Sequence, residues 1–375
     1  MNRVPGTGKS RKKQIKYFDY TLLFIIIFLV GFGLVMLYST SSYNARLNFN
    51  GDSAYYLKRQ LTASLLGFAA MLVVSRIDYH IWLRLSVLLY AGAFGLCFLV
   101  IFIGANINGS TRWLRLGPLS FQPSELAKMA VIVFLSAVIS QAPKKIGDFK
   151  ILCKLVGFTV GPMFLVVGFS NLSTAIIIAG VGACVVFVAS PKYLQFILLG
   201  LGTAAGGAVL LFTAAYRAER IQVWLHPEEH EKGYQTLQGL YAIGSGGLFG
   251  KGLGESMQKL GFVPEAQNDM IFSIICEELG LFGAVCVILL FLLMIWRFLV
   301  IANNAPDLFG ALMVVGIMGH IAIQVILNIA VVTNSIPNTG VTLPFISYGG
   351  TSVAILLTEM GLALSVSRSI KLEMI

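Results

Sequence analysis

Apolar residues run through this chain in long stretches, and polar residues are concentrated in the segments between those stretches. A helix needs about 20 apolar residues to cross the ~30 Å hydrocarbon core of a membrane. The pattern therefore predicts an all-α polytopic membrane protein with about ten transmembrane helices. The expected helices lie near residues 19–40, 60–75, 84–104, 124–141, 154–170, 172–190, 194–215, 270–297, 308–331 and 351–367.

The composition agrees with a membrane protein. Of 375 residues, 57% are hydrophobic and only 12% are charged, which is about half the charged fraction of a soluble domain. The first apolar stretch, residues 20–38, is longer than the ~7–15 residues of a signal-peptide core, so we expect it to remain as a helix. The five cysteines are scattered through apolar segments without metal-ligand spacing, which favours reduced filler residues.

The basic residues set the expected orientation. Most of the 27 lysine and arginine residues fall on the side of the N-terminus, and cytoplasmic loops carry such an excess. We therefore expect cytoplasmic tails over residues 1–18 and 369–375, around a single membrane domain over residues 19–368. The net charge of +10 is then explained mostly by membrane orientation and by attraction to anionic lipids. Because no basic-aromatic patch is present, no nucleic acid is expected as a partner.

With this orientation, three long polar segments lie on the outer side of the membrane, at residues 105–123, 216–269 and 333–350. The second is a large extracellular loop between the seventh and eighth helices. The third has too many Gly and Pro residues for a helix and is too apolar for a solvated loop. It therefore predicts a re-entrant segment that floors a pocket before the tenth helix. Since function usually lies on such loops, we expect the site on this face.

Asp269 is the last charged residue before the apolar stretch that begins the eighth helix, so its carboxylate is expected at the membrane surface. A carboxylate there is costly to desolvate, which makes it a functional candidate. The alternative is a helix cap, because Asp is a favoured N-cap residue and suits the positive end of the helix dipole. The segment alone leaves both interpretations open.

The first outer segment contains further candidates. Glu125 and Lys128 are three residues apart, so they share a helix face. They form either a self-satisfied structural pair or part of a site. Arg112 beside Trp113 suits an interfacial anchor, but a guanidinium also binds phosphate oxygens in a fork. The outer positive charges therefore indicate either headgroup anchoring or an anionic substrate.

The glycine-rich run at residues 244–254 contains Lys251 but lacks the Gly-x4-Gly-Lys-Ser/Thr order of a nucleotide-binding loop. Its backbone amides either cradle an anion or belong to a flexible, turn-rich loop. Nearby, His226 and His230 are four residues apart in a segment rich in Pro and Glu. This spacing favours a solvated turn over a metal site.

Three acidic residues fall deep within predicted helices. Glu277 and Glu278 lie in the eighth helix, and we expect structural pairing for both. Their expected partners are Lys128, Gln324 or each other through a shared proton. Glu359 lies about two turns into the last helix and is expected to face the same interior.

Four motifs occur in order along the chain. They are Phe-Gln-Pro-Ser-Glu-Leu-Ala-Lys at 121–128, Gly-Gly-Leu-Phe-Gly-Lys-Gly at 246–252, the run from Val-Pro-Glu to Glu-Glu-Leu-Gly at 263–280, and Leu-Pro-Phe-Ile-Ser-Tyr-Gly-Gly at 343–350. These motifs resemble the signatures of the SEDS family of bacterial cell-wall proteins, whose branches include FtsW, RodA and SpoVE. The resemblance runs from residue 19 to about residue 368. It implies a ten-helix enzyme that polymerises lipid II into β-1,4 glycan strands at the outer face of the bacterial cytoplasmic membrane.

The resemblance also implies roles for individual residues. Asp269 matches the essential acid of the family and is expected to be the general base. Arg112 and Lys128, with Lys251 or a divalent cation (Mg²⁺ or Mn²⁺), are expected to hold the pyrophosphate. The other expected substrate-binding residues belong to the same motifs and are Gln122, Glu125, Glu265, Ser347 and Gly349.

The expected partners are a class B penicillin-binding transpeptidase and membrane proteins of the divisome. The runs at 331–333 and 336–343 look closer to FtsW and SpoVE than to RodA, which favours septal synthesis at the division septum. The run at 170–174 lacks an acid that the family commonly carries there. The alternatives are a lipid II flippase, a scaffold without chemistry, or an elongation or sporulation paralogue of the same enzyme.

Overall fold

The computed structural model describes residues 15–107, 110–116, 119–190, 192, 194–197, 200–202 and 215–372. Within these residues, nine helices are long and apolar enough to cross a membrane, which confirms the predicted all-α polytopic class. The predicted helix over 194–215 falls mostly outside the described residues.

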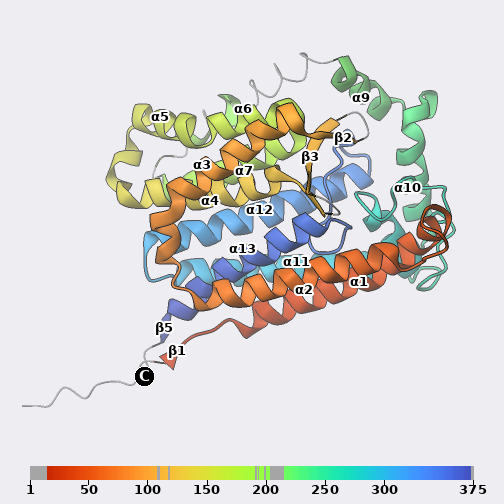
Figure 1. Ribbon diagram of the computed structural model, residues 1–375, viewed down its shortest axis with the longest axis horizontal. Coiled ribbons are helices and arrows are strands. Elements are labelled where there is room, and N and C mark those ends of the chain that lie inside the picture. The colour runs from red at the N-terminus through yellow and green to blue at the C-terminus, as the bar shows by residue number, and fades with distance from the viewer. Residues whose placement is uncertain are drawn as a thin grey trace, which may run out of the picture.

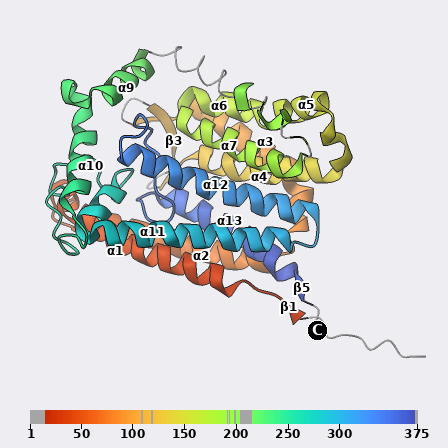
Figure 2. The same cartoon turned by 180° about the vertical axis from the view of Figure 1, so that it is seen from behind.

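The long helices run side by side along the long axis of the molecule (Figures 1 and 2). They are α1 (Tyr20–Asn48), α2 (Tyr55–Arg76), α3 (His80–Ile103), α4 (Pro123–Gln141), α5 (Phe149–Thr159), α6 (Gly161–Ser170), α7 (Leu172–Ala189), α11 (Ile271–Asn303), α12 (Leu308–Val332) and α13 (Gly350–Ser369). Most side chains of α4 and α12 are buried, so these two helices form the centre of the bundle. The helices α5 and α6 share one predicted span, which breaks beside Pro162 because proline lacks an N–H donor.

Local sequence explains where several helices begin. The side chain of Asp19 accepts a hydrogen bond from the amide of Leu22 at 2.8 Å, and that of Asp307 accepts one from Gly310 at 2.8 Å. Each caps an amide that has no partner within the helix. Pro123 occupies the first turn of α4, where its missing N–H costs nothing.

Short elements gather at one end of the bundle, which we call the α10 end (Figure 1). They comprise β2 (Ala105–Ile107), β3 (Ser110–Leu116), β4 (Leu119–Phe121), α9 (Ala215–Leu225), η2 (Pro227–Glu229), η3 (Glu231–Gly233) and α10 (Tyr234–Ser245). The three strands form an antiparallel sheet in the order β2-β3-β4. From the sequence this region is expected to be a polar loop, because strands of three to seven residues give almost no periodic signal.

The opposite end of the bundle holds both chain termini of the described region (Figure 2). Here β1 (Ile15–Lys16) pairs antiparallel with β5 (Lys371–Leu372), and η1 (Pro143–Gly147) precedes α5. The guanidinium of Arg297 donates to the Asp19 carboxylate at 2.7 Å. The pairing of β1 with β5 places residues 15–16 beside residues 371–372 at this end of the bundle.

Candidate functional site

The three polar segments that the sequence singles out meet at the α10 end. The amide of Tyr348 donates to the carbonyl of Gln267 at 2.9 Å and joins the third segment to the second. The Oγ1 of Thr351, at the start of α13, donates to the carbonyl of Ser120 in β4 at 2.7 Å. These bonds make one connected region out of segments that are far apart in the chain.

Asp269 lies within this region, two residues before α11. The Nδ2 of Asn328 on α12 donates to the carbonyls of Asp269 at 2.7 Å and Val341 at 2.8 Å. Asp269 is only 7% exposed, and the Nε2 of Gln235 on α10 lies 3.5 Å from its Oδ1. The N-cap residue of α11 is Met270. The structure therefore does not support the simple capping interpretation of Asp269.

The carboxylate of Asp269 forms no ion pair with any residue that the structure describes. Burial, and then the charge of Glu265, raise the pKa of Asp269 to about 6. The charge of Arg220 and the amides of Asp269 and Met270 act in the opposite direction. The carboxyl group therefore titrates near neutral pH, which suits a general base.

A buried polar chain leads from this region into the bundle. Gln324 donates to the carbonyl of Thr342 at 3.0 Å and accepts from Lys128 at 3.2 Å. The ammonium group of Lys128 lies 2.9 Å from Glu125, and Ser352 donates to Glu125 at 2.8 Å. The predicted pairing of Glu125 with Lys128 is confirmed. Lys128 is only 1% exposed, so a ligand reaches it only if neighbouring side chains move.

Two of the other predicted binding residues near the strands are held by local contacts. The Nε of Arg112 donates to the carbonyl of Ser170 at 3.0 Å, and Gln122 donates to Ser124 at 3.0 Å. Glu265 is exposed, and its backbone adopts a φ of 51°. Arg112 and Glu265 therefore remain partly or fully accessible at the α10 end.

Ser347 and Gly349 belong to the irregular segment before α13. The Oγ of Ser347 accepts a hydrogen bond from the amide of Leu343 at 2.8 Å. The amide of Gly349 donates to the side chain of Gln60 at 3.1 Å. Much of the segment is buried although it is not helical. In the structure both residues hold the backbone of this segment in place.

Glu277 and Glu278 are buried, and each pairs with a lysine. Glu277 lies 2.6 Å from the ammonium group of Lys251, and Glu278 lies 2.7 Å from that of Lys259. The hydroxyl of Ser39 on α1 also donates to Glu278 at 2.7 Å. Both acids therefore have a structural partner, as predicted, and Lys251 is one of those partners.

The partners named from the sequence, which were Lys128, Gln324 or a proton shared by the two acids, were wrong. That prediction treated α11 as one continuous helix deep in the membrane. Instead, α11 is interrupted at Gly280, which has a φ of 67°. The loop at 246–259 folds back onto the interruption and brings its own lysines.

The glycine-rich run fills this interruption with backbone hydrogen bonds. They run from Lys251 N to Glu277 O (2.9 Å), from Gly252 N to Glu278 O (3.0 Å), from Leu281 N to Gly247 O (2.9 Å) and from Phe282 N to Leu248 O (3.0 Å). They satisfy the groups that the break would leave unpaired. The run is therefore neither an open anion cradle nor a flexible loop, since two of its amides bind α11.

Three residues near Asp269 were not selected from the sequence: Asn328, Gln235 and Arg220. For Asn328 a signal existed, because it follows Gln324 by four residues in an apolar stretch and shares its helix face. Gln235 and Arg220 lie in the long loop, where no periodicity indicates which side chains turn towards the bundle.

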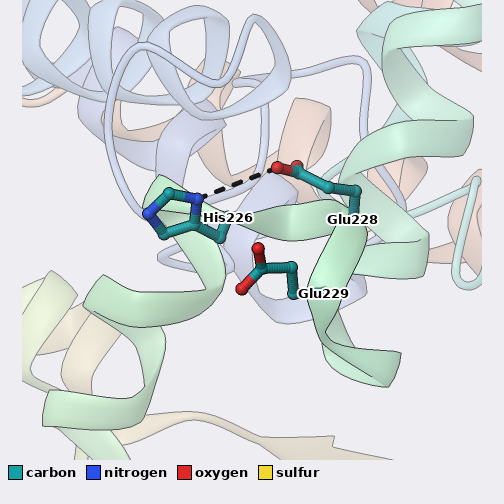
Figure 3. A group of neighbouring side chains, drawn as sticks. All are labelled: His226, Glu228 and Glu229. Atoms are coloured by element: carbon teal, nitrogen blue, oxygen red, sulfur yellow. Dashed lines mark ion pairs between the residues drawn. The ribbon is translucent and has the colours of Figure 1, made fainter.

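His226, Glu228 and Glu229 lie together in the long loop (Figure 3). One ligand atom from each falls within 4.8 Å of the others, and all three residues are exposed. The structure thus groups His226 with two carboxylates, whereas the sequence pairs it with His230 in a solvated turn. His and Glu are ligand types for divalent cations, but the expected cation remains a prediction.

The family follows from a comparison of sequences. The family described as "Cell cycle protein" (FtsW/RodA/SpoVE) matches residues 20–372. Stage V sporulation protein E of Bacillus subtilis (strain 168) is 41% identical, over 93% of this chain and 97% of its own. Probable peptidoglycan glycosyltransferase FtsW of Geobacter sp. (strain M18) is 37% identical, over 95% and 98%. The chain belongs to the FtsW/RodA/SpoVE family, which confirms the resemblance.

Solved structures with the same fold support this assignment. The structure described as "Structural coordination of polymerization and crosslinking by a peptidoglycan synthase complex" has a TM-score of 0.79 at 28% identity. It covers 94% of this chain and 98% of its own. The crystal structure of Thermus thermophilus rod shape determining protein RodA has a TM-score of 0.70 at 27% identity, over 94% and 97%.

Proposed function

We propose that this protein is a peptidoglycan glycosyltransferase that polymerises lipid II into β-1,4 glycan strands at the outer face of the cytoplasmic membrane. The observation that carries the proposal is Asp269, a buried carboxylate that forms no ion pair with the described residues and lies where three polar segments meet. The relatives named probable peptidoglycan glycosyltransferase FtsW support the same activity.

In the proposed reaction, Asp269 accepts the proton of the acceptor sugar's 4-hydroxyl. The hydroxyl oxygen forms a bond to C1 of the donor sugar while the bond from C1 to the pyrophosphate breaks. Attack opposite an α-linked pyrophosphate inverts C1 and gives the β-1,4 linkage. A base of this kind contributes roughly 10²–10⁴-fold to the rate.

The leaving pyrophosphate needs positive charge. Of the predicted cations, Lys128 is buried and Lys251 lies against the break in α11. We therefore assign the first contact to Arg112, which is partly exposed at the α10 end. Because Lys128 is buried, binding at its ammonium group requires neighbouring side chains to move. Electrostatic stabilisation of this kind is often the largest catalytic term. A divalent cation would supply the same charge.

The decisive experiment is glycan-strand formation from purified lipid II by wild type and Asp269→Asn, each with and without the cognate transpeptidase. Asparagine preserves the shape of the side chain but is not a base. We expect polymer from wild type and none from a folded variant.

Equal polymer from both proteins would reject Asp269 as the base while keeping the enzyme. No polymer from either protein, with the partner present, would favour lipid II transport or a scaffold.

We also propose that the enzyme acts in septal synthesis with a class B penicillin-binding transpeptidase and other divisome membrane proteins. The high identity to FtsW and SpoVE relatives supports this assignment. The test is complementation in hosts depleted of the division, elongation or sporulation paralogue. Rescue of elongation alone would reject the septal role.

A further inference from the structure

A groove separate from the Asp269 region lies between the α10 end of α1 and the loop at residues 253–260. It has a volume of about 400 Å³, and its lining does not include Asp269. Both ribbon views place this end of α1 beside the loop (Figures 1 and 2). The lining residues that matter here are Tyr38, Ser39 and Arg46 from α1, and Leu253, Lys259 and Leu260 from the loop.

The break in α11 places the groove at the edge of the hydrocarbon core. Residues 281–303 are about 34 Å long at 1.5 Å per residue, so they cross the ~30 Å core without the part before the break. Gly280 therefore lies near the boundary of the core. Lys259 in the groove pairs with Glu278, two residues before Gly280. The groove is thus at headgroup level.

The groove carries an excess of positive charge. Arg46 is exposed, and its guanidinium makes no hydrogen bond or ion pair with the residues that the structure describes. The ammonium group of Lys259 donates to Glu278 and to Ser39, which leaves one of its three N–H donors. Among the described residues, Glu278 pairs with Lys259 and no acid pairs with Arg46, so the groove carries two positive charges against one negative charge.

Below and beside the cations the surface is apolar. Val35, Tyr38 and Leu253 line the groove and are about half exposed. Tyrosine is enriched where a membrane meets water, because its ring is apolar and its hydroxyl is polar. An apolar wall under a cationic rim matches a molecule with a phosphate headgroup and a fatty chain.

We propose that this groove binds an anionic phospholipid of the surrounding leaflet, with the phosphate between Arg46 and Lys259 and a chain along Val35 and Tyr38. The site is separate from Asp269, and the proposal does not depend on the proposed enzymatic activity. A polyprenyl phosphate carries the same chemistry, so the test includes that lipid.

The test is native mass spectrometry of the full chain titrated with phosphatidylglycerol, with phosphatidylethanolamine as the zwitterionic reference. Arg46→Gln removes the rim charge. Lys58→Gln is the matched control, because Lys58 is exposed on α2 at the same end and pairs with Asp52. We expect Arg46→Gln to lower the preference for phosphatidylglycerol about fivefold, from ~1 kcal/mol per basic residue.

We expect Arg46→Lys to retain the preference and Lys58→Gln to leave it unchanged. The proposal is overturned if Arg46→Gln binds like wild type, or if Lys58→Gln loses as much, since the effect would then be general surface charge. Tighter binding of undecaprenyl phosphate than of phosphatidylglycerol through Arg46 would also overturn it, in favour of a polyprenyl site.

Discussion

Two kinds of buried carboxylate occur at the α10 end, and their surroundings differ more than their burial. Glu277 and Glu278 each hold a lysine within 2.7 Å and receive further hydrogen bonds. Asp269 is buried as well, but in the part of the chain that the structure describes it has one long side-chain contact and no ion pair. A paired acid holds two segments together, whereas an unpaired acid keeps a proton affinity that chemistry can use.

The largest expected effect comes from exchanging the acids for amides one at a time. Asp269→Asn should lower lipid II polymerisation by roughly 10²–10⁴-fold, because the proposed base is lost. Its thermal stability should equal or exceed that of wild type, since no ion pair is broken. Glu277→Gln, measured in parallel, should lose stability, because Lys251 loses its partner. If Asp269→Asn instead loses stability and keeps its activity, while Glu277→Gln keeps its stability, the distinction between the two kinds of acid is wrong.

The second expected effect concerns the buried pair of Glu278 and Lys259. Glu278→Gln leaves the ammonium group of Lys259 buried without its counter-charge. Breaking such a pair costs roughly 3–5 kcal/mol, measured as the free energy of unfolding in detergent. The double variant Glu278→Gln with Lys259→Met should recover much of this loss. If the double variant is no more stable than Glu278→Gln, the unpaired ammonium group of Lys259 does not explain the loss of stability.

The break in α11 provides the third test. Gly280→Ala adds a Cβ 2.3 Å from the amide nitrogen of Gly250, at a φ of 67°. We expect a loss of roughly 1–3 kcal/mol from backbone strain alone. Gly31→Ala in α1 is the control, because its added Cβ meets nothing within 4 Å. Equal stabilities of the two variants would show that the loop is not seated in the break.

The fourth and smallest effect is the pH dependence. Because the pKa of Asp269 is about 6, polymerisation should fall about tenfold per pH unit as the pH drops below that value. Its pKa is raised above the unfolded value of about 3.9. The folded state therefore binds more protons between these values, and this group's contribution to stability falls as pH rises from about 4 to 6. Asp269→Asn should remove that slope.

An acid limb of the rate profile near pH 4 would instead indicate a solvent-exposed base. An unchanged stability slope in the Asn variant would assign the titration to another group.

The fold was largely predictable because membrane helices are recognised by the length and composition of their apolar stretches. The apolar stretches at 308–331 and 351–367 correspond closely to α12 and α13. The sequence around Gly280 does not indicate a break in α11, since the residues after Gly280 continue the apolar stretch. A helix can break at such a position only where another segment supplies the missing hydrogen bonds. The presence of that segment is a property of the tertiary structure, which the local sequence does not indicate.

Contacts at the candidate site were predictable where the two residues are close in the sequence. They were not predictable where a distant loop folds back onto a helix. The spacing of Glu125 and Lys128 was sufficient to predict their contact. The partners of Glu277 were not predictable, because Lys251 comes from a loop whose path no periodicity encodes. Asn328 was within reach of the sequence, since an amide one turn from Gln324 in an apolar helix needs polar neighbours.

Asn328 also offers a spectroscopic handle on this region. Its single side-chain amide binds the backbone on both sides of the candidate site, at Asp269 and at Val341. In a sample with isotope-labelled asparagine, the two protons of this group should resonate apart from those of solvated amides and exchange slowly with water. Their signal would report, without any substrate, whether the segments around Asp269 and Val341 are assembled at the candidate site.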